Sequence, residues 1–355
     1  MQPKLRYSLA AALLTVALTP LSAQSVTTTP VGAVSMEALA NSDTLLTTTL
    51  VRPSVYQGTV TNIEGNNLTL SGFSFADGDL QYQVGVQSNT YYLHVISGEK
   101  AGHYSTVIAN NGSAVTLEFE DDIISGLAQG DSVVIRPYWT LGTLFPAVDA
   151  GKSFIASTNN FGAGRRTEIL FPNVVGAGIN KSTSVIYYFN SYWRMAGNVA
   201  PNRDDVIVPP DTYFTIRNNN GSDSTDLTTV GEVDAHPFVV SIAKYASSQT
   251  DNPVSMIRPV EMKLGELGLD DVFVPSTNNF SSGRGDELLV YDSSTAVKNR
   301  SATSIYFFNG FWRRAGNVGV NQNETLIPAG AALVIRKQKA TVNDVEDWVI
   351  PPLSL

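Results

Sequence analysis

The chain contains no cysteine and only three histidines, although it is 355 residues long. The lack of cysteine excludes disulfides, thiol nucleophiles and zinc–thiolate sites. Three histidines leave little room for a multi-histidine metal centre or for histidine-based catalysis. The sequence therefore predicts no metal site and no cofactor.

Charged residues are also few, at 15% of the chain, and 32 acidic against 23 basic side chains give a formal net charge of −9. Because 43% of the residues are hydrophobic, the composition is that of a folded chain rather than a disordered one. An acidic chain repels phosphate backbones, so nucleic acid is not an expected partner. No apolar run of about 20 residues follows residue 30, which predicts no transmembrane segment in the mature chain.

The N-terminus has the features of an export signal. Lys4 and Arg6 precede an apolar stretch at 7–18, Pro20 ends it, and Leu21-Ser22-Ala23 offers a cleavage site before Gln24. We expect a signal peptide at 1–23 and a mature chain in the periplasm, on the outer surface or outside the cell. The alternative is a buried N-terminal helix.

Gly, Pro, Thr, Ser and Asn are abundant, and they belong to short strands and tight turns. Between residues 54 and 138, short alternating segments are separated by turns that contain glycine. Strands at this spacing predict a small antiparallel barrel or sandwich. The expected strands are 56–63, 68–70, 91–96, 104–109, 114–119 and 132–136.

The second half of the chain contains an internal repeat at a shift of 119 residues. Residues 157–161 (STNNF) recur at 276–280, and residues 196–199 (AGNV) recur at 315–318. No gap is needed between 154 and 217, which indicates a duplicated unit. The predicted fold is therefore all-β, with a barrel or sandwich followed by a duplicated, hairpin-rich region packed as one unit. The predicted divisions are a signal peptide (1–23), an N-terminal extended segment (24–53), the barrel or sandwich (54–138), repeat 1 (139–258) and repeat 2 (259–355).

A two-residue hairpin lies at the centre of each copy, with its turn at Asn190-Ser191 or at Asn309-Gly310. A loop of this length places Trp193 opposite Tyr188 and, in the second copy, Trp312 opposite Phe307. It also places Arg194 opposite Tyr187, and we expect these two side chains to stack as a cation–π pair.

These motifs resemble a family of uncharacterised secreted proteins that occurs as many paralogues in Verrucomicrobia-type bacteria. The resemblance rests on residues 29–32 (TPVG), residues 138–146 (YWTLGTLFP) and the two Phe-Asn-x-aromatic-Trp-Arg hairpins, each followed by a proline turn and Ile-Arg. It implies export, β architecture and an envelope or extracellular setting. The family has no established activity, so the resemblance transfers no catalytic residue.

The repeated polar and aromatic residues are the candidate ligand-binding positions. Amide, guanidinium and carboxylate groups bind sugar hydroxyls, and an exposed tryptophan provides a stacking face. The alternative, which we favour, is that the Asn-Asn pairs cap turns, the arginines form structural ion pairs and the tryptophans lie in the core. The positions are Asn159, Asn160, Arg165, Trp193 and Arg194 in the first copy, and Asn278, Asn279, Arg284, Trp312 and Arg313 in the second.

Other candidates carry weaker signals. His94 and His103 flank a probable turn but would form an incomplete metal site, and His236 has no visible partner in the sequence. The acidic stretches at 77–79 and 118–122 match no calcium-loop pattern. No nucleophile elbow, phosphate loop or dinucleotide motif is present, so no catalytic residue is predicted.

The sequence thus favours an exported, non-enzymatic structural or interaction protein of the cell envelope or extracellular matrix. Its partners would be envelope or matrix components, glycans, or further copies of itself through residues 24–50. The first alternative is a carbohydrate-binding module protein. The least favoured is a glycan-active hydrolase, which would need two carboxylates facing each other across a cleft.

Overall fold

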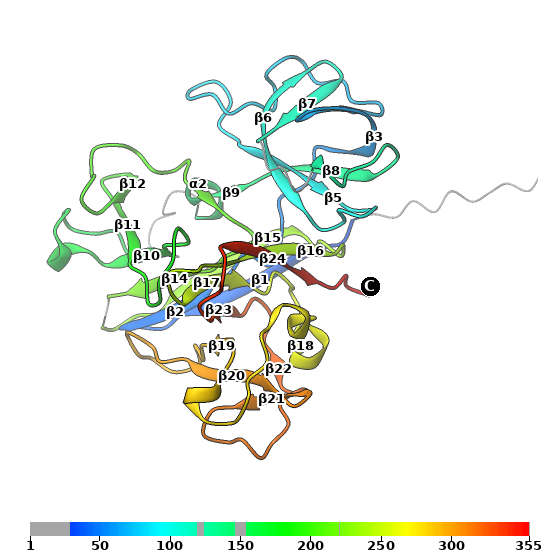
Figure 1. Cartoon of the computed structure of the whole chain (residues 1–355). Helices are drawn as coiled ribbons and strands as arrows, with labels where there is room; N and C mark the ends of the chain where they lie inside the picture. The colour runs from blue at the N-terminus through cyan, green and yellow to red at the C-terminus, as the bar shows by residue number, and fades with distance from the viewer. Residues whose placement is uncertain (1–28, 119–123, 146–153, 220, 355) are drawn as a thin grey trace, which may run out of the picture.

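The computed structural model describes residues 29–118, 124–145, 154–219 and 221–354. Its regular structure is almost entirely β, as predicted, and falls into one closed barrel, two five-stranded sheets and several two-stranded ribbons. In Figure 1 the barrel lies at the top, the hairpin strands of the first copy at the left, and those of the second copy at the bottom. The predicted signal peptide lies outside the described residues.

The barrel is closed in the order β3-β4-β7-β6-β5-β8, so a barrel and not a sandwich is formed. Alternate side chains fill its interior, among them Leu68, Leu93, Val115 and Val133, each fully buried. All six predicted strands are present with ends shifted by at most a few residues. They are β3 (Tyr56–Glu64), β4 (Asn67–Leu70), β5 (Tyr91–Val95), β6 (Tyr104–Asn111), β7 (Ala114–Leu117) and β8 (Ser132–Pro137).

The two five-stranded sheets have the same strand order. The first is β12-β11-β10-β14-β2 and the second is β21-β20-β19-β23-β17. The predicted hairpin registers are confirmed, since Tyr188 pairs with Trp193 and Phe307 with Trp312. The strands of the first sheet are β12 (Tyr192–Met195), β11 (Thr183–Phe189), β10 (Thr167–Pro172), β14 (Phe214–Asn218) and β2 (Ser42–Leu46); those of the second are β21 (Phe311–Arg314), β20 (Thr303–Phe308), β19 (Glu287–Val290), β23 (Ala332–Lys337) and β17 (Thr250–Ser255).

Two-stranded ribbons and short helical turns complete each copy. The ribbons are β1 (Val31–Ala38) with β15 (Thr225–Glu232), β16 (Phe238–Lys244) with β24 (Asp344–Ile350), β9 (Trp139–Thr140) with β13 (Ile207–Val208), and β18 (Met262–Lys263) with β22 (Leu326–Ile327). The helical turns are α2 (Leu141–Leu144), η1 (Gly162–Gly164), η2 (Leu264–Glu266), η3 (Leu269–Val272) and η4 (Ser281–Gly283).

Strand pairing divides the chain differently from the sequence-based boundaries. β1 and β2, from the predicted extended segment 24–53, pair with β15 and β14 of the first copy. β16 and β17, from the predicted repeat 1, pair with β24 and β23 of the second copy. The barrel is therefore an insertion in the first copy: residues 47–138 separate β2 from β9, whereas residues 256–261 alone separate β17 from β18.

Each copy covers the free sheet edge of the other. The backbone N–H of Asp43 in β2 donates to Val297 O of the second copy, at 3.0 Å, and Asp251 N in β17 donates to Gly178 O of the first copy, also at 3.0 Å. Covered edges cannot pair with another chain. β1 and β2 both pair within the chain, and the outer edge of β2 is covered. Pairing of residues 24–50 onto a neighbouring molecule through β1 stays a prediction.

An ion pair anchors each covered edge at equivalent positions. Asp43 accepts two hydrogen bonds of 2.7 Å from Arg217, and Asp251 accepts bonds of 2.7 and 3.0 Å from Arg336. The covering loops also contribute backbone donors, because Asn299 N binds Asp43 and Asn180 N binds Asp251, each at 2.7 Å. We call the loops 173–182 and 292–300, with the carboxylates they bind, the reciprocal clamps.

The polar stretch 218–226 forms a loop only in its centre. Asn218 ends β14 and is fully buried, and Thr225 begins β15 and is also buried. The Asn218 amide donates to Ala38 O at 3.3 Å and to Asp223 O at 3.0 Å. The stretch is polar like a surface loop, but its buried polar groups are satisfied by hydrogen bonds within the chain.

Candidate functional site

The two repeated tryptophans are core residues. Trp193 and Trp312 are each 1% exposed. Trp193 packs against Phe154 with ring centroids 5.2 Å apart, and Trp312 packs against the equivalent Phe273 at 5.0 Å. Rings buried in this way offer no face on which a sugar or a partner side chain could stack.

The repeated asparagines stabilise the loops that contain them. Asn159 Oδ1 accepts a hydrogen bond of 2.8 Å from Phe161 N, and Asn278 Oδ1 does the same for Phe280 N. Asn160 and Asn279 each accept a 3.0 Å hydrogen bond from a buried tyrosine hydroxyl, that of Tyr187 or Tyr306. The amide oxygens are therefore occupied in turns and caps, the geometry of an Asx turn.

The repeated arginines also have internal partners. Arg165 and Arg284 lie over Tyr187 and Tyr306, with 4.7 and 5.1 Å between guanidinium carbon and ring centroid. Each also pairs with a carboxylate three residues ahead, at 3.5 Å for Glu168 and 3.1 Å for Glu287.

The cation–π pair expected between Arg194 and Tyr187 is therefore formed by Arg165 instead. Arg194 turns toward the hairpin end, where its guanidinium carbon lies 5.7 Å from the Tyr192 ring and its Nη1 bonds Val199 O. Arg313 likewise lies 5.4 Å from the Phe311 ring, and its Nη1 donates to Val318 O at 3.1 Å.

Two aromatic positions are exposed in both copies. Phe161 is 77% exposed and Phe280, its equivalent at a shift of 119, is 76% exposed. The hairpin-end residues Tyr192 and Phe311 are also equivalent and are 46% and 42% exposed. We call the exposed aromatics of each copy, Phe161 and Tyr192 in the first and Phe280 and Phe311 in the second, the aromatic tip of that copy. An arginine, Arg194 or Arg313, packs on the hairpin aromatic of each copy.

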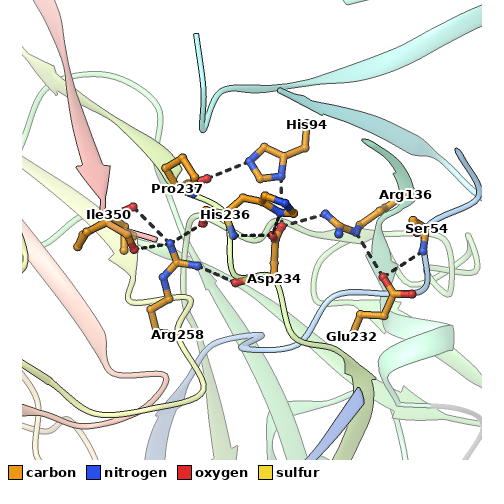
Figure 2. Close-up of polar contacts among 10 residues, drawn as sticks. Ser54, His94, Arg136, Glu232, Asp234, His236, Pro237, Arg258 and Ile350 are labelled. Atoms are coloured by element: carbon orange, nitrogen blue, oxygen red, sulfur yellow. Dashed lines mark hydrogen bonds and ion pairs between the residues drawn. The ribbon is translucent and has the colours of Figure 1, made fainter. Parts of the chain in front are cut away.

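All three histidines lie near the junction of the barrel with the repeats. His94 Nδ1 lies 3.1 Å from Asp234 Oδ2, and His94 Nε2 lies 3.1 Å from Pro237 O (Figure 2). His236 Nδ1 contacts the other Asp234 oxygen at 2.7 Å, so this histidine does have a partner. His103 pairs with Asp347 of β24 at 2.9 Å.

Two arginines extend the cluster around Asp234. Arg136 of the barrel donates to Asp234 Oδ2 at 2.9 Å, and Arg258 donates to the carbonyls of Asp234 and His236 at 2.8 and 2.7 Å (Figure 2). Burial by itself would raise the pKa of the Asp234 carboxyl, but hydrogen bonds from His236 and His94 and the charge of Arg136 outweigh it and hold that pKa well below its usual range. The Asp234 cluster thus joins the barrel to the rest of the chain through a buried carboxylate surrounded by donors.

A cleft of about 530 Å³ lies where the barrel meets both copies. It is lined by the start of β6, including Tyr104, by β16 and β17, and by the turn at 209–212. Asp211 is the one carboxylate among the described lining residues. Because glycoside hydrolysis uses two facing carboxylates, this lining does not supply that arrangement.

The described residues contain neither a candidate metal centre nor a candidate membrane-spanning helix. No group of three or more His, Asp or Glu side chains there could hold a metal ion. No helix in that part of the chain has the length and apolar character needed to cross a bilayer. Most of the acidic stretch 118–122 lies outside the described residues.

No protein-family model, curated protein or solved structure matched this chain.

Proposed function

We propose that this chain is an exported, non-enzymatic interaction protein of the cell envelope or extracellular matrix, and that its two aromatic tips are equivalent binding points. The observation that carries the proposal is the retention of an exposed phenylalanine, Phe161 and Phe280, at the same place in both copies. A residue that is three-quarters exposed contributes little to the core, so core packing does not explain why both copies keep it.

The neighbouring positions strengthen this argument. Directly after the phenylalanine, Gly162-Ala163 in the first copy corresponds to Ser281-Ser282 in the second, so the loop has tolerated change. The asparagine two residues before it, Asn159 or Asn278, is explained by the hydrogen bond that it accepts from the loop backbone. The phenylalanine ring has no comparable internal role, which leaves recognition as the physical reason for keeping it.

The chemistry of the tips favours a protein partner. Aromatic side chains and arginine are enriched at the energetic centres of protein interfaces, and each tip combines them. A glycan is less suited, because the tryptophans are buried and the asparagine amide oxygens are occupied within the fold. Two tips on one chain would let it join two partner molecules, as a matrix or envelope protein requires.

Sedimentation with envelope and matrix fractions of the producing cells tests the proposal. Variants Phe161→Ser and Phe280→Ser each leave one tip, and we expect each to weaken retention by about 100-fold because bivalent binding becomes monovalent. The double variant should not be retained. Val84→Ser, which removes an 80% exposed barrel residue present once, is the matched control and should bind like the unmodified chain.

Protease treatment of the fractions separates the two partner classes. Loss of retention after proteolysis supports a protein partner, whereas retention that survives proteolysis and is lost after glycan digestion favours the carbohydrate-binding alternative. Retention of the double variant at the level of the Val84→Ser control would contradict the proposal. Export is tested separately by sequencing the secreted chain, which should begin at Gln24.

A further inference from the structure

The cleft at the barrel junction depends on the barrel, which is inserted in the first copy alone. Tyr104 and Thr106 of β6 line one side, and the inserted barrel that carries them has no counterpart in the second copy. The other side is lined by residues of both copies, including Ile207 of β13, Val239 of β16 and Pro253 of β17. Concave sites at the meeting of several structural units are the usual places for small ligands.

Asp211 is a carboxylate that the fold does not require. Its equivalent in the second copy, 119 residues on, is Gly330. Both residues use their backbone carbonyl in the same reciprocal packing: Asp211 O accepts from Ser255 N at 2.9 Å, and Gly330 O accepts from Thr47 Oγ1 at 3.1 Å. Gly330 makes this contact without a side chain, since its φ is 61° and a Cβ there would lie 2.6 Å from the Thr49 side chain. The carbonyl contact therefore does not need the Asp211 carboxyl.

No cationic partner accompanies this carboxylate among the described residues. The described lining of the cleft contains no lysine or arginine. His103 lines the cleft but is paired with Asp347. The internal donors to the Asp211 carboxyl are the Tyr104 hydroxyl and the backbone N–H of Asp211 itself, and both are neutral. A poorly hydrated carboxylate without a counter-charge is costly, because charged groups in proteins are normally paired when they are buried.

The aromatic wall beside Asp211 provides a second element of recognition. Tyr104 and Tyr138 both line the cleft, with ring centroids 6.4 Å apart, and Tyr104 is fixed by stacking on Phe238 at 5.1 Å. We propose that the cleft binds a small organic ammonium ion, with the Asp211 carboxylate as its counter-charge and the Tyr104 and Tyr138 rings as its walls. Aromatic faces and a carboxylate together attract a substituted ammonium, and the apolar lining accepts its alkyl groups.

The remaining polar lining argues against a neutral polyhydroxylated ligand. Thr212 Oγ1 donates to Pro253 O at 3.1 Å, and the Asn252 amide bonds Ala243 N and O, each at 2.9 Å. Thr106 Oγ1 is paired with the Tyr138 hydroxyl at 3.2 Å. Few side-chain groups are left to bind sugar hydroxyls, whereas the Asp211 carboxylate retains acceptor capacity.

Protonation of Asp211 gives the site a pH signature. Burial raises the pKa of the Asp211 carboxyl, and the hydrogen bond from Tyr104 offsets this only in part. Burial also raises the pKa of Tyr104 and of Tyr138, so both phenols stay neutral. A cation binds the ionised carboxylate, so its affinity should rise with pH through the titration of Asp211, and binding at low pH should release protons.

Isothermal titration of the purified mature chain tests the site. The free-amine arm compares choline with its neutral isostere 3,3-dimethylbutan-1-ol, and n-butylammonium with n-butanol. The tethered arm uses a capped peptide with one lysine, which tells whether an ammonium on a polymer can reach the cleft. We expect saturable binding of at least one cation and none of the neutral isosteres.

The variant Asp211→Asn should weaken cation binding by about 10- to 100-fold, the range expected for a hydrogen bond to a charged group. It should not lower the melting temperature, because it removes a poorly solvated charge. Asp211→Gly, which copies Gly330, is the second variant if the first misfolds. Asp270→Asn makes the same charge change at an exposed position and should bind normally.

Equal binding of cations and neutral isosteres, no saturable binding up to millimolar concentrations, or full affinity in Asp211→Asn would overturn the proposal.

Discussion

At the scale of single residues, the two hairpin turns show how the same backbone is built from different side chains. Asn190 and Ser191 have φ angles of 52° and 69°, and Asn309 and Gly310 have 54° and 77°. Positive φ at both central positions defines the tight hairpin turn that the sequence predicted. Glycine adopts this conformation freely, whereas serine does so at a cost.

Exchanging serine and glycine at the equivalent positions of the two turns should therefore have opposite effects on stability. We expect Ser191→Gly to stabilise the chain by about 1 kcal/mol and Gly310→Ser to destabilise it by a similar amount, since a Cβ at Gly310 meets no nearby atom and backbone strain alone acts. Denaturant unfolding of both variants measures this. Equal destabilisation by the two changes would show that side-chain contacts, not φ, set the preference.

The aromatic tips and the tryptophans show that the burial of a single side chain could not be predicted from the sequence alone. Alternation placed Trp193 opposite Tyr188 correctly, but strand period alone cannot say which face becomes core. Phe161 was visible in the repeated STNNF segment, yet its exposure depends on a loop geometry fixed by Asn159. The signal in the sequence was that both copies keep this phenylalanine. That signal indicates binding only once the side chain is known to be exposed.

At the scale of elements, the reciprocal clamps explain how two similar units form one body. Burial by itself would raise the pKa of the Asp43 carboxyl, but hydrogen bonds from Arg217 and from the Asn299 backbone, with the Arg217 charge, outweigh it and lower that pKa. A carboxyl with a lowered folded-state pKa stabilises the fold above its unfolded pKa, and this contribution is lost as pH falls.

We therefore expect the free energy of unfolding to fall as pH drops below about 4, the ordinary pKa of an aspartate in an unfolded chain. Asp43→Asn should be less stable at neutral pH and should flatten this acid dependence. Unfolding measured from pH 2 to 7 tests both effects. A variant whose pH profile parallels that of the unmodified chain would mean that the clamp carboxylate contributes nothing to acid sensitivity.

The clamp loops themselves offer an element-scale test. Asn180 and Asn299 both have φ of 51°, a conformation that asparagine tolerates better than most residues. Asn299→Ala should destabilise the chain by about 1–2 kcal/mol through strain and loss of the 2.9 Å bond from Arg217. Asn299→Gly should recover part of this loss. Thermal unfolding distinguishes the two, and an alanine variant as stable as the glycine variant would argue against strain.

Elements built from local signals were predictable, and those built from distant pairing were not. The barrel strands follow from alternation between glycine turns, and the hairpins from two-residue loops. β1 pairs with β15, so that Met36 lies opposite Leu227, and no local pattern in 24–53 indicates that partner. The barrel insertion hid the equivalence of β1 and β2 with β16 and β17, because it shifts the first two strands out of the register of 119 residues.

At the scale of the whole molecule, the Asp234 cluster joins the barrel to the duplicated body. His94 and Arg136 come from barrel strands β5 and β8, while Asp234 and Arg258 come from segments of the body. Removing one member of a buried charge cluster leaves the others unpaired, and such changes typically cost about 3–5 kcal/mol.

Asp234→Ala should accordingly lower stability by about 3–5 kcal/mol and loosen the barrel from the body. His236→Ala, which removes a half-exposed partner of the same carboxylate, should cost about 1 kcal/mol. Calorimetry gives the stabilities, and limited proteolysis should cleave Asp234→Ala faster within residues 47–55. Cleavage at the unmodified rate would show that other contacts hold the barrel in place.

The cleft could not be predicted from the sequence, because it exists only in the folded whole molecule. Its lining combines residues near 104, 138, 211, 240 and 252, which come together only after the barrel and both copies pack. Asp211 in particular sits in a turn whose partner in the other copy is glycine, so a comparison of the repeats shows a difference there, not a motif.

The central claim is that one chain joins two partners through its aromatic tips, and particle bridging measures this directly. Beads coated with the retained envelope or matrix component should clump when the unmodified chain is added. Phe161→Ser and Phe280→Ser should each still bind the beads but fail to clump them. Clumping by either single-tip variant as strong as that of the unmodified chain would contradict the account.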